Sequence, residues 1–197
     1  KGRDAKKGKI RSPATVNRYL GALSCLFTTA RRQWRLVQDN PVFEIPKLEE
    51  PRGRVRSLTD DERELLLTAC KKSANPFLYV IVVICIATGA RKMEIVGLEK
   101  KEVDRKRQAI ILEDTKNGDR RILFLGDYAW DLLMQHIEEY SGGSKLVFPS
   151  PYNPEKPIDI QSAWEKALER ANIEDFRFHD LRHTAASYLA MNGASLT

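Results

Sequence analysis

Three short segments of the sequence hold side chains that could act on a phosphate group. In the first, TGARKME, Arg91 follows a long apolar run and Glu94 comes three residues later. Residues three apart share a helix face, so Glu94 could orient the Arg91 guanidinium, while free N–H groups at a helix start help to receive an anionic oxygen. Taken alone, an arginine of this kind is more often a surface ion pair.

The second segment, TKNG, places Lys116 next to Asn117-Gly118, a dipeptide typical of a tight β-hairpin turn. A lysine at a hairpin tip can reach a substrate and donate a proton to a leaving alkoxide if its pKa is lowered. The alternative interpretation of this residue by itself is an ordinary solvated lysine.

The third segment, HDLRH, has spacing that puts His179, Arg182 and His183 on one helix face. A proton carrier beside a phosphate-binding guanidinium is what phosphoryl transfer requires. A metal site made of His179, Asp180 and His183 is the alternative. The remaining histidine, His136, has no ligand spacing with these residues, so we expect no metal.

Turn signals and apolar periodicity predict the elements that position these segments. Ser12-Pro13 begins a helix over residues 13–36, and Asn40-Pro41 ends it. Residues 47–56 (KLEEPRGRVR) have the composition of a linker, and TDDE at 59–62 is a capping box. Further helices are predicted near 62–72, 76–88, 91–98, 128–140, 160–171 and 179–190, with strands at 108–113, 120–125 and 146–148.

This order of elements predicts a fold that is mainly α with a small antiparallel sheet (α+β). We expect residues 1–48 to belong to a helical domain, residues 49–57 to be a linker and residues 58–197 to form a second domain.

The net charge of +6 is unevenly distributed along the chain. Residues 1–56 hold 14 Lys and Arg against 5 Asp and Glu, whereas residues 57–197 hold 19 against 22. A basic arm on a near-neutral body is typical of a nucleic-acid binder. A solvated basic tail is the alternative.

The three cysteines, Cys25, Cys70 and Cys85, sit among apolar residues without CxxC spacing, so we expect buried free thiols in a reducing compartment. The apolar run 77–87 is too short to cross a membrane. The first residues lack the apolar stretch of a signal peptide, so we expect none. These features favour a cytoplasmic location without membrane association.

Three strings, ATGARKMEIVGL, TKNG and FHDLRHTAASYLAMNG, occur in the order that resembles the tyrosine recombinase (phage integrase) family. The stretch ATVNRYLGALSCLFTTARR is similar to the last helices of that family's core-binding domain, and RVRSLTDDE resembles the entry to its catalytic domain. The resemblance covers nearly the whole chain and implies a site-specific DNA recombinase, with residues 1–48 as part of the core-binding domain and 58–197 as the catalytic domain.

The resemblance also implies a role for each matching residue. Arg91 and Arg182 would bind the non-bridging oxygens of the scissile phosphate, Lys116 would be the general acid for the departing 5′ oxygen, and His179 the general base for an attacking tyrosine. Supporting roles would fall to Glu94 and His183. The family forms a 3′-phosphotyrosine link and needs neither a metal nor a nucleotide cofactor.

Double-stranded DNA is the implied partner, and a homo-tetramer on DNA is the implied working state of the full-length protein. We expect DNA phosphate contacts from basic residues of the arm and linker, namely Lys9, Arg11, Arg18, Arg52, Arg54 and Arg56.

One member of the family's catalytic set has no match in the sequence. The resemblance implies that the nucleophilic tyrosine lies beyond Arg182, further along than Thr197. Tyr188 falls on a different helix face, where we expect it to pack in the core. This chain alone is therefore expected to be inactive. The alternative functions are a non-catalytic DNA-binding regulator with this fold and a metal-dependent phosphohydrolase built on His179 and Asp180.

Overall fold

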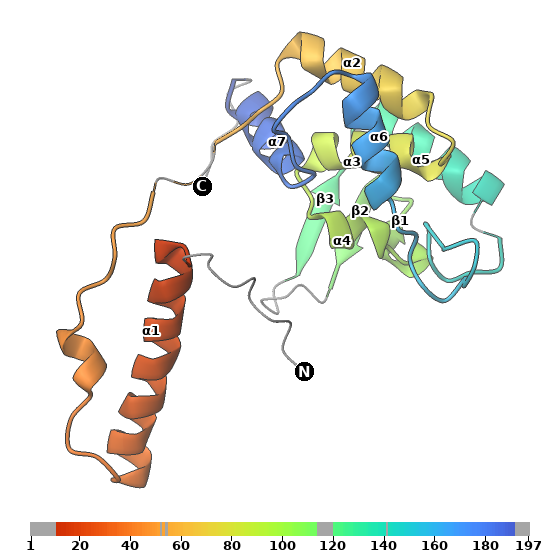
Figure 1. Ribbon diagram of the computed structural model, residues 1–197. Helices are drawn as coiled ribbons and strands as arrows, with labels where there is room; N and C mark the ends of the chain where they lie inside the picture. Colours follow the sequence, from red (N-terminus) through yellow and green to blue (C-terminus); the bar gives the residue numbers. More distant parts are fainter. Residues whose placement is uncertain (1–10, 52, 54, 114–119, 141, 192–197) are drawn as a thin grey trace. The chain divides into compact units, whose positions relative to one another are not determined.

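The computed structural model describes residues 11–51, 53, 55–113, 120–140 and 142–191. It divides into two compact units, residues 1–54 and 55–197, each described here by itself (Figure 1). The point of division falls within the segment predicted to be a linker.

The first unit is built on one long helix. Helix α1, Pro13–Thr29, begins at Ser12, whose hydroxyl accepts a hydrogen bond from the Thr15 N–H at 3.3 Å. The helix continues through a π-helical turn, Ala30–Trp34, and ends where Arg35 adopts φ 53°. The predicted helix over 13–36 is therefore present, with a wider last turn than the pattern indicates.

Two asparagines fasten the return segment of this unit to α1. The buried Asn40 amide donates to the Ser24 carbonyl at 2.9 Å, and its oxygen accepts from the Val42 N–H at 3.0 Å, which starts the 3₁₀ turn Pro41–Glu44. Asn17 exchanges two hydrogen bonds with the Leu48 backbone, at 2.8 and 2.9 Å.

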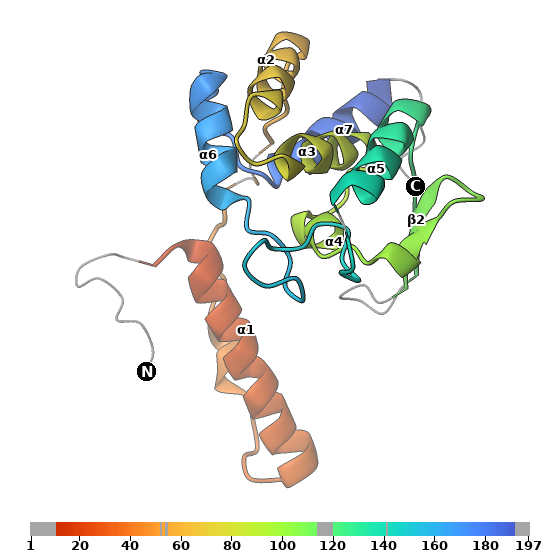
Figure 2. The ribbon, with the colours of Figure 1, turned by 90° about the vertical axis from the view of Figure 1, so that its right-hand side faces the viewer.

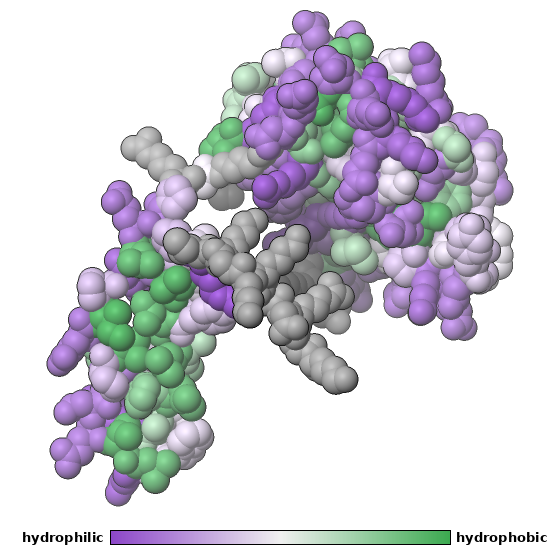
Figure 3. Space-filling view, in the orientation of Figure 1, coloured by the Kyte–Doolittle hydropathy of each residue, from purple (hydrophilic) through white to green (hydrophobic). Residues whose placement is uncertain are grey.

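Much apolar surface of this unit stays exposed, as Figure 3 shows along α1 and the return segment; it includes Tyr19, Leu23, Leu26, Trp34, Leu36, Phe43, Ile45 and Leu48. Cys25 is also exposed, so the expectation that all three thiols are buried is wrong for this one. Its neighbours in sequence are apolar, but no element among the described residues of this unit covers its face of α1.

The second unit is organised around helix α3, Phe77–Thr88, of which eight residues are buried. Figure 2 shows it surrounded by α2, Asp60–Lys71, α5, Asp127–Tyr140, and α7, Asp180–Met191, all of which contact it. Helix α6, Gln161–Arg170, packs on α2. A helix that is apolar on every side can only be stable at the centre of such a group.

The small sheet has three antiparallel strands in the order β1-β2-β3: Val103–Asp104, Ala109–Leu112 and Arg121–Phe124. The short strand β1 and the 3₁₀ turn Lys100–Glu102 before it were not predicted. The predicted Asn117-Gly118 turn lies outside the described residues. The fold is thus mainly α with a small antiparallel sheet, as predicted from the order of elements.

The predicted strand at 146–148 is not a strand. Leu146 forms only an isolated bridge with Glu99, and the Val147 N–H donates to the Leu98 carbonyl at 2.8 Å. The apolar side chains of this segment are buried in the core, so their pattern reports burial and not a ladder.

Local signals set the ends of the main helices. At the start of α2 the Glu62 N–H donates to the Thr59 hydroxyl and the Glu62 carboxylate accepts from the Thr59 N–H, which confirms the capping box. Nearby, the Leu58 N–H donates to the buried Thr184 hydroxyl of α7 at 3.0 Å.

Within the described ranges, no helix combines the length and apolar character needed to cross a membrane.

Candidate active site

The first site arginine stands at the turn between α3 and a short helix, α4, Lys92–Val96. Helix α3 ends at Gly89, whose φ of 62° lies in the left-handed region. A Cβ at this position would lie 3.4 Å from the Ala185 Cβ of α7, so glycine suits both the backbone angle and the close packing. Arg91 follows in extended conformation as the N-cap of α4, with its side chain 46% exposed.

Glu94 clamps Arg91 through both the backbone and the side chain. One carboxylate oxygen accepts from the Arg91 guanidinium at 2.6 Å and the other from the Arg91 N–H at 2.8 Å. Burial acts to raise the pKa of Glu94, but these hydrogen bonds and nearby positive charge outweigh it, so the pKa is lowered. The predicted orienting contact between Glu94 and Arg91 is therefore formed.

A second arginine, which the sequence pattern did not single out, also contacts Glu94. Arg121, the first residue of β3, places Nη1 3.3 Å from the second Glu94 oxygen. The signal available in the sequence was strand alternation, because Arg121 lies two residues before the buried Leu123 and so faces the same side of the sheet.

Arg182 comes to the same place from α7. Its Nη1 donates to the Gly89 carbonyl at 2.7 Å. Burial lowers the pKa of Arg182, and the positive charges of Arg121 and Arg91 lower it further, while Glu94 acts in the opposite direction. Two guanidinium groups thus contact the Glu94 carboxylate, and the third, that of Arg182, lies close enough to feel their charges, an arrangement that favours binding of an additional anion.

The two motif histidines are adjacent at the start of α7. His179 is exposed in the turn before the helix and His183 is half-buried one turn later, with ring centroids 5.7 Å apart. The preceding Phe178 packs edge-on against Trp164 of α6 at 4.9 Å and lies 5.7 Å below the Lys92 ammonium. These contacts anchor the turn that carries His179.

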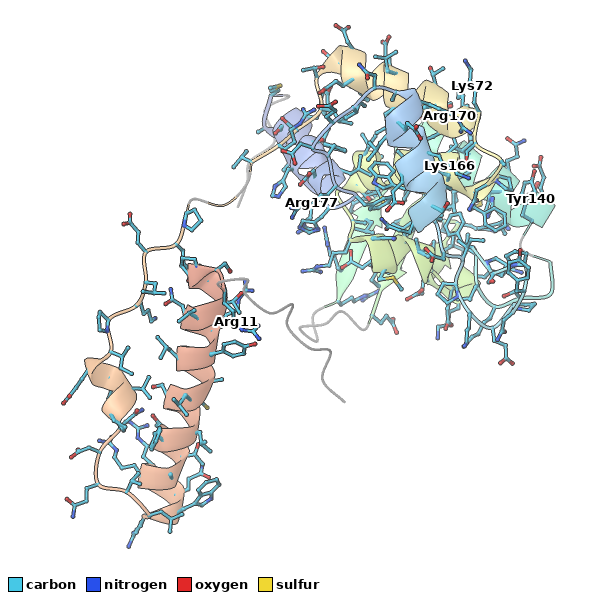
Figure 4. The ribbon with its side chains drawn as sticks, viewed as in Figure 1. Arg11, Lys72, Tyr140, Lys166, Arg170 and Arg177 are labelled. Carbon is cyan, nitrogen blue, oxygen red and sulfur yellow. The ribbon has the colours of Figure 1, made fainter. Side chains whose placement is uncertain are left out.

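The remaining candidates for a metal site have other partners. The Asp180 carboxylate accepts from the Arg177 N–H at 2.8 Å, which ties the first residue of α7 to the turn before it (Figure 4 labels Arg177). His136 is buried in the core, where its ring stacks on Phe148 and its Nε2 is hydrogen-bonded to the Val147 carbonyl at 3.0 Å. The described residues contain no group of three or more His, Cys, Asp or Glu that could hold a metal ion.

The predicted DNA-contacting residues fall into three groups. Lys9, Arg52 and Arg54 lie outside the described residues, as does Lys116. Arg11 and Arg18 are exposed on the first unit, and the Arg11 guanidinium lies 5.4 Å from the centre of the Tyr19 ring (Figure 4).

Arg56 is held by internal contacts. Its guanidinium forms a two-nitrogen ion pair with Glu62, donates to the Ser57 carbonyl at 2.6 Å and lies over the Phe176 ring. The hydrogen bonds from Arg56 lower the pKa of Glu62 to about 2. In this geometry Arg56 fastens the segment before α2 to Glu62 and Phe176, which leaves its guanidinium less available to a phosphate.

Tyr188 has a structural environment. Its hydroxyl donates to the Asp60 carboxylate, and the Arg63 guanidinium lies 4.8 Å from the centre of its ring. These contacts join α7 to the start of α2. The expectation that Tyr188 packs in the core is wrong, because its ring is only half-buried, beside Arg63 at the surface of α2.

A broad hollow of about 1390 Å³ lies on another part of the second unit. Its lining includes Tyr140, Lys166 and Arg170, which Figure 4 labels, together with residues of the loop after α5. None of the three clustered arginines lines it. This hollow and the arginine cluster are therefore separate features.

Comparison with known proteins places these motifs in a family. Residues 56–197 match the model of the phage integrase family. The integrase of Salmonella phage P22 is 31% identical over 206 residues, which cover 97% of this chain and 51% of that protein. The shufflon-specific DNA recombinase of Escherichia coli is 35% identical over 91% of this chain and 44% of its own length. The chain thus spans about half the length of these curated relatives.

Solved structures are similar in fold. The catalytic domain of bacteriophage HP1 integrase is 30% identical, with a TM-score of 0.56 over 72% of this chain and 76% of that chain. The Tn1549 transposon integrase, solved in complex with circular intermediate DNA, is 21% identical, with a TM-score of 0.73 over 94% of this chain and 69% of that chain. Since the family model covers well over half of the sequence, including all three arginines of the cluster, the chain belongs to the phage integrase family.

Proposed function

We propose that this chain is part of a site-specific tyrosine recombinase, which breaks and rejoins DNA strands through a 3′-phosphotyrosine intermediate. The observation that carries this proposal is the convergence of Arg91 and Arg121 on the Glu94 carboxylate, with Arg182 bonded to the neighbouring Gly89 carbonyl and within the influence of all three charges. Three positive charges against one negative charge favour a bound phosphodiester over an empty site.

In this reaction the oxygen of a tyrosine attacks the scissile phosphorus, and the bond to the 5′ oxygen breaks. Arg91 and Arg182 stabilise the charge that develops on the non-bridging oxygens. His179, which is exposed at the start of α7, accepts the proton of the tyrosine, and Lys116 donates a proton to the departing 5′ oxygen. A 5′ hydroxyl later attacks the phosphotyrosine, so the strand is rejoined without a nucleotide cofactor.

The nucleophile itself is proposed to come from outside residues 1–197. Tyr188 is bonded to Asp60 and covered by Arg63, and Tyr79 and Tyr128 share a hydrogen bond of 2.6 Å. These contacts support structural roles for the three tyrosines. We therefore expect the 197-residue chain to bind DNA and to form no covalent adduct.

Double-stranded DNA is the proposed partner, and the cytoplasm is the proposed location. The excess of basic residues over residues 1–56 supports the first assignment, as does the DNA bound to the similar Tn1549 integrase. A homo-tetramer on DNA stays a prediction, which the mass of the complex between the complete gene product and its DNA would measure.

Covalent trapping tests the proposal. The complete gene product is allowed to select duplexes from a random pool, and nicked versions of these duplexes are then used as suicide substrates. The unaltered protein should form a covalent protein–DNA adduct, whereas Arg91→Ala and Arg182→Ala should each reduce adduct formation by at least about 100-fold. Arg105→Ala, in the exposed turn between β1 and β2, is the matched control and should react normally.

Two outcomes would contradict this function. Normal trapping by either arginine variant would show that the cluster does not carry the chemistry. Sequence-selective DNA binding without any adduct would favour a non-catalytic DNA-binding regulator.

A further inference from the structure

We propose that Arg121 is a positioning residue of this site. It binds the Glu94 carboxylate and so holds Arg91 in place for the phosphate. This role rests on the proposed recombinase function, because it concerns the same site. Arg121 is assigned no contact with the substrate.

The geometry of Glu94 explains why a second arginine is useful. One carboxylate oxygen takes the Arg91 guanidinium at 2.6 Å, and the other takes the Arg91 N–H at 2.8 Å and the Arg121 guanidinium at 3.3 Å. The Glu94 side chain is only 13% exposed, so little water is available to orient it. Arg121 therefore supplies the donor that keeps the carboxylate from turning away from Arg91.

The surroundings of Arg121 suit positioning of the Glu94 carboxylate better than direct binding of a phosphate. Its side chain is 30% exposed, compared with 46% for Arg91, so it is the more enclosed of the two. It is also held in the ladder of the sheet, where it pairs with Leu112. A contact built on a strand is more rigid than one built on a loop, which suits a positioning role.

The charges of the cluster give a second reason. Among the described residues of the cluster, three arginines and one glutamate leave a net charge of +2. A phosphodiester carries one negative charge, and its pentacoordinate transition state carries two. Without Arg121 the Glu94 charge would be balanced by Arg91 alone, which would leave less of the Arg91 charge for the transition state, so the loss should slow the reaction more than it weakens binding.

A purely structural ion pair is the competing explanation, and the same unit offers a matched control. Arg63 pairs with Asp60 at 3.4 Å and is also 30% exposed, but it lies on α2 and contacts Tyr188 instead of the cluster. If the Arg121 pair only stabilised the fold, Arg121→Gln and Arg63→Gln would behave alike.

The test measures the rate of adduct formation, DNA affinity and thermal stability for Arg121→Gln, Arg121→Lys, Glu94→Gln, the Arg121→Gln/Glu94→Gln double variant and Arg63→Gln in the complete gene product. We expect Arg121→Gln to slow adduct formation about tenfold while DNA affinity changes less than about twofold. Arg121→Lys should recover most of the rate, because it keeps the charge and a donor. The double variant should be no slower than Glu94→Gln alone, since both changes act through one carboxylate.

Several results would overturn the proposal. They are an unchanged rate in Arg121→Gln, an equal loss of rate and affinity, or multiplicative losses in the double variant. If Arg121→Gln does not fold, Arg121→Lys takes its place in the same cycle, and failure of both to fold would make the residue structural. Absence of any adduct with the unaltered protein is a separate result, which would remove the proposed function and this role with it.

Discussion

Gly89 provides a sharp test of how the site is held together, because its backbone angle disfavours any other residue and α7 lies directly beside it. Its φ of 62° is in the left-handed region, and an added Cβ would lie 3.4 Å from the Ala185 Cβ. For alanine the backbone angle costs about 1–2 kcal/mol. The contact of 3.4 Å is near the lower edge of ordinary van der Waals separation, so it adds little. We therefore expect Gly89→Ala to reduce the free energy of unfolding by about 1–2 kcal/mol.

Two further variants separate the constraints. Asparagine tolerates the left-handed region better than alanine, so Gly89→Asn should lose less stability than Gly89→Ala. Valine is poorly tolerated at positive φ and brings additional methyl groups toward α7, so Gly89→Val should lose about 3 kcal/mol or more. Gly126 is the control, because a Cβ there meets nothing within 4 Å and its φ is not positive.

Urea unfolding of the 197-residue chain, followed by near-UV circular dichroism, measures these changes. Gly126→Ala should be neutral or stabilising by up to about 1 kcal/mol. If Gly89→Ala were as stable as Gly126→Ala, the assigned turn geometry between α3 and α4 would be refuted. If Gly89→Val were no worse than Gly89→Asn, both the positive φ of Gly89 and the close approach of α7 would be contradicted.

Three smaller predictions concern buried groups. Thr184→Val should cost about 1–3 kcal/mol in urea unfolding, because the buried N–H that its hydroxyl accepts from would lose its partner, whereas Thr184→Ser should lose less. Burial lowers the pKa of His136 from its ordinary value of 6.5, so the unfolded chain takes up a proton at a higher pH than the folded chain does. The free energy of unfolding should therefore fall as the pH drops below 6.5, and His136→Phe should weaken this dependence on pH. A thiol reagent should modify Cys25 rapidly in the native protein, while Cys70, whose pKa burial raises to about 12, and Cys85 should react only on unfolding; rapid modification of all three would contradict the packing of α2 and α3.

Much of this protein could be predicted from short stretches of its sequence. The capping box at Thr59, the glycine that ends α3 and the continuous apolar character of α3 each depend on residues only a few positions apart. The spacing within TGARKME likewise predicted the contact between Arg91 and Glu94, which are three residues apart. Interactions of this range are decided by local geometry, which the sequence states directly.

Tertiary structure decided the features that depend on the path of the chain. Arg121 reaches Glu94 across 27 positions, and Arg182 reaches the Gly89 carbonyl across 93. The exposure of Cys25 and the absence of a strand at 146–148 likewise follow from which elements pack nearby. The sequence by itself identified the two motif arginines, the helices that carry them and the family they resemble. Only the folded chain brought Arg121 to Glu94 and Arg182 to the neighbouring Gly89 carbonyl, because the partner of a long charged side chain depends on elements that meet in space.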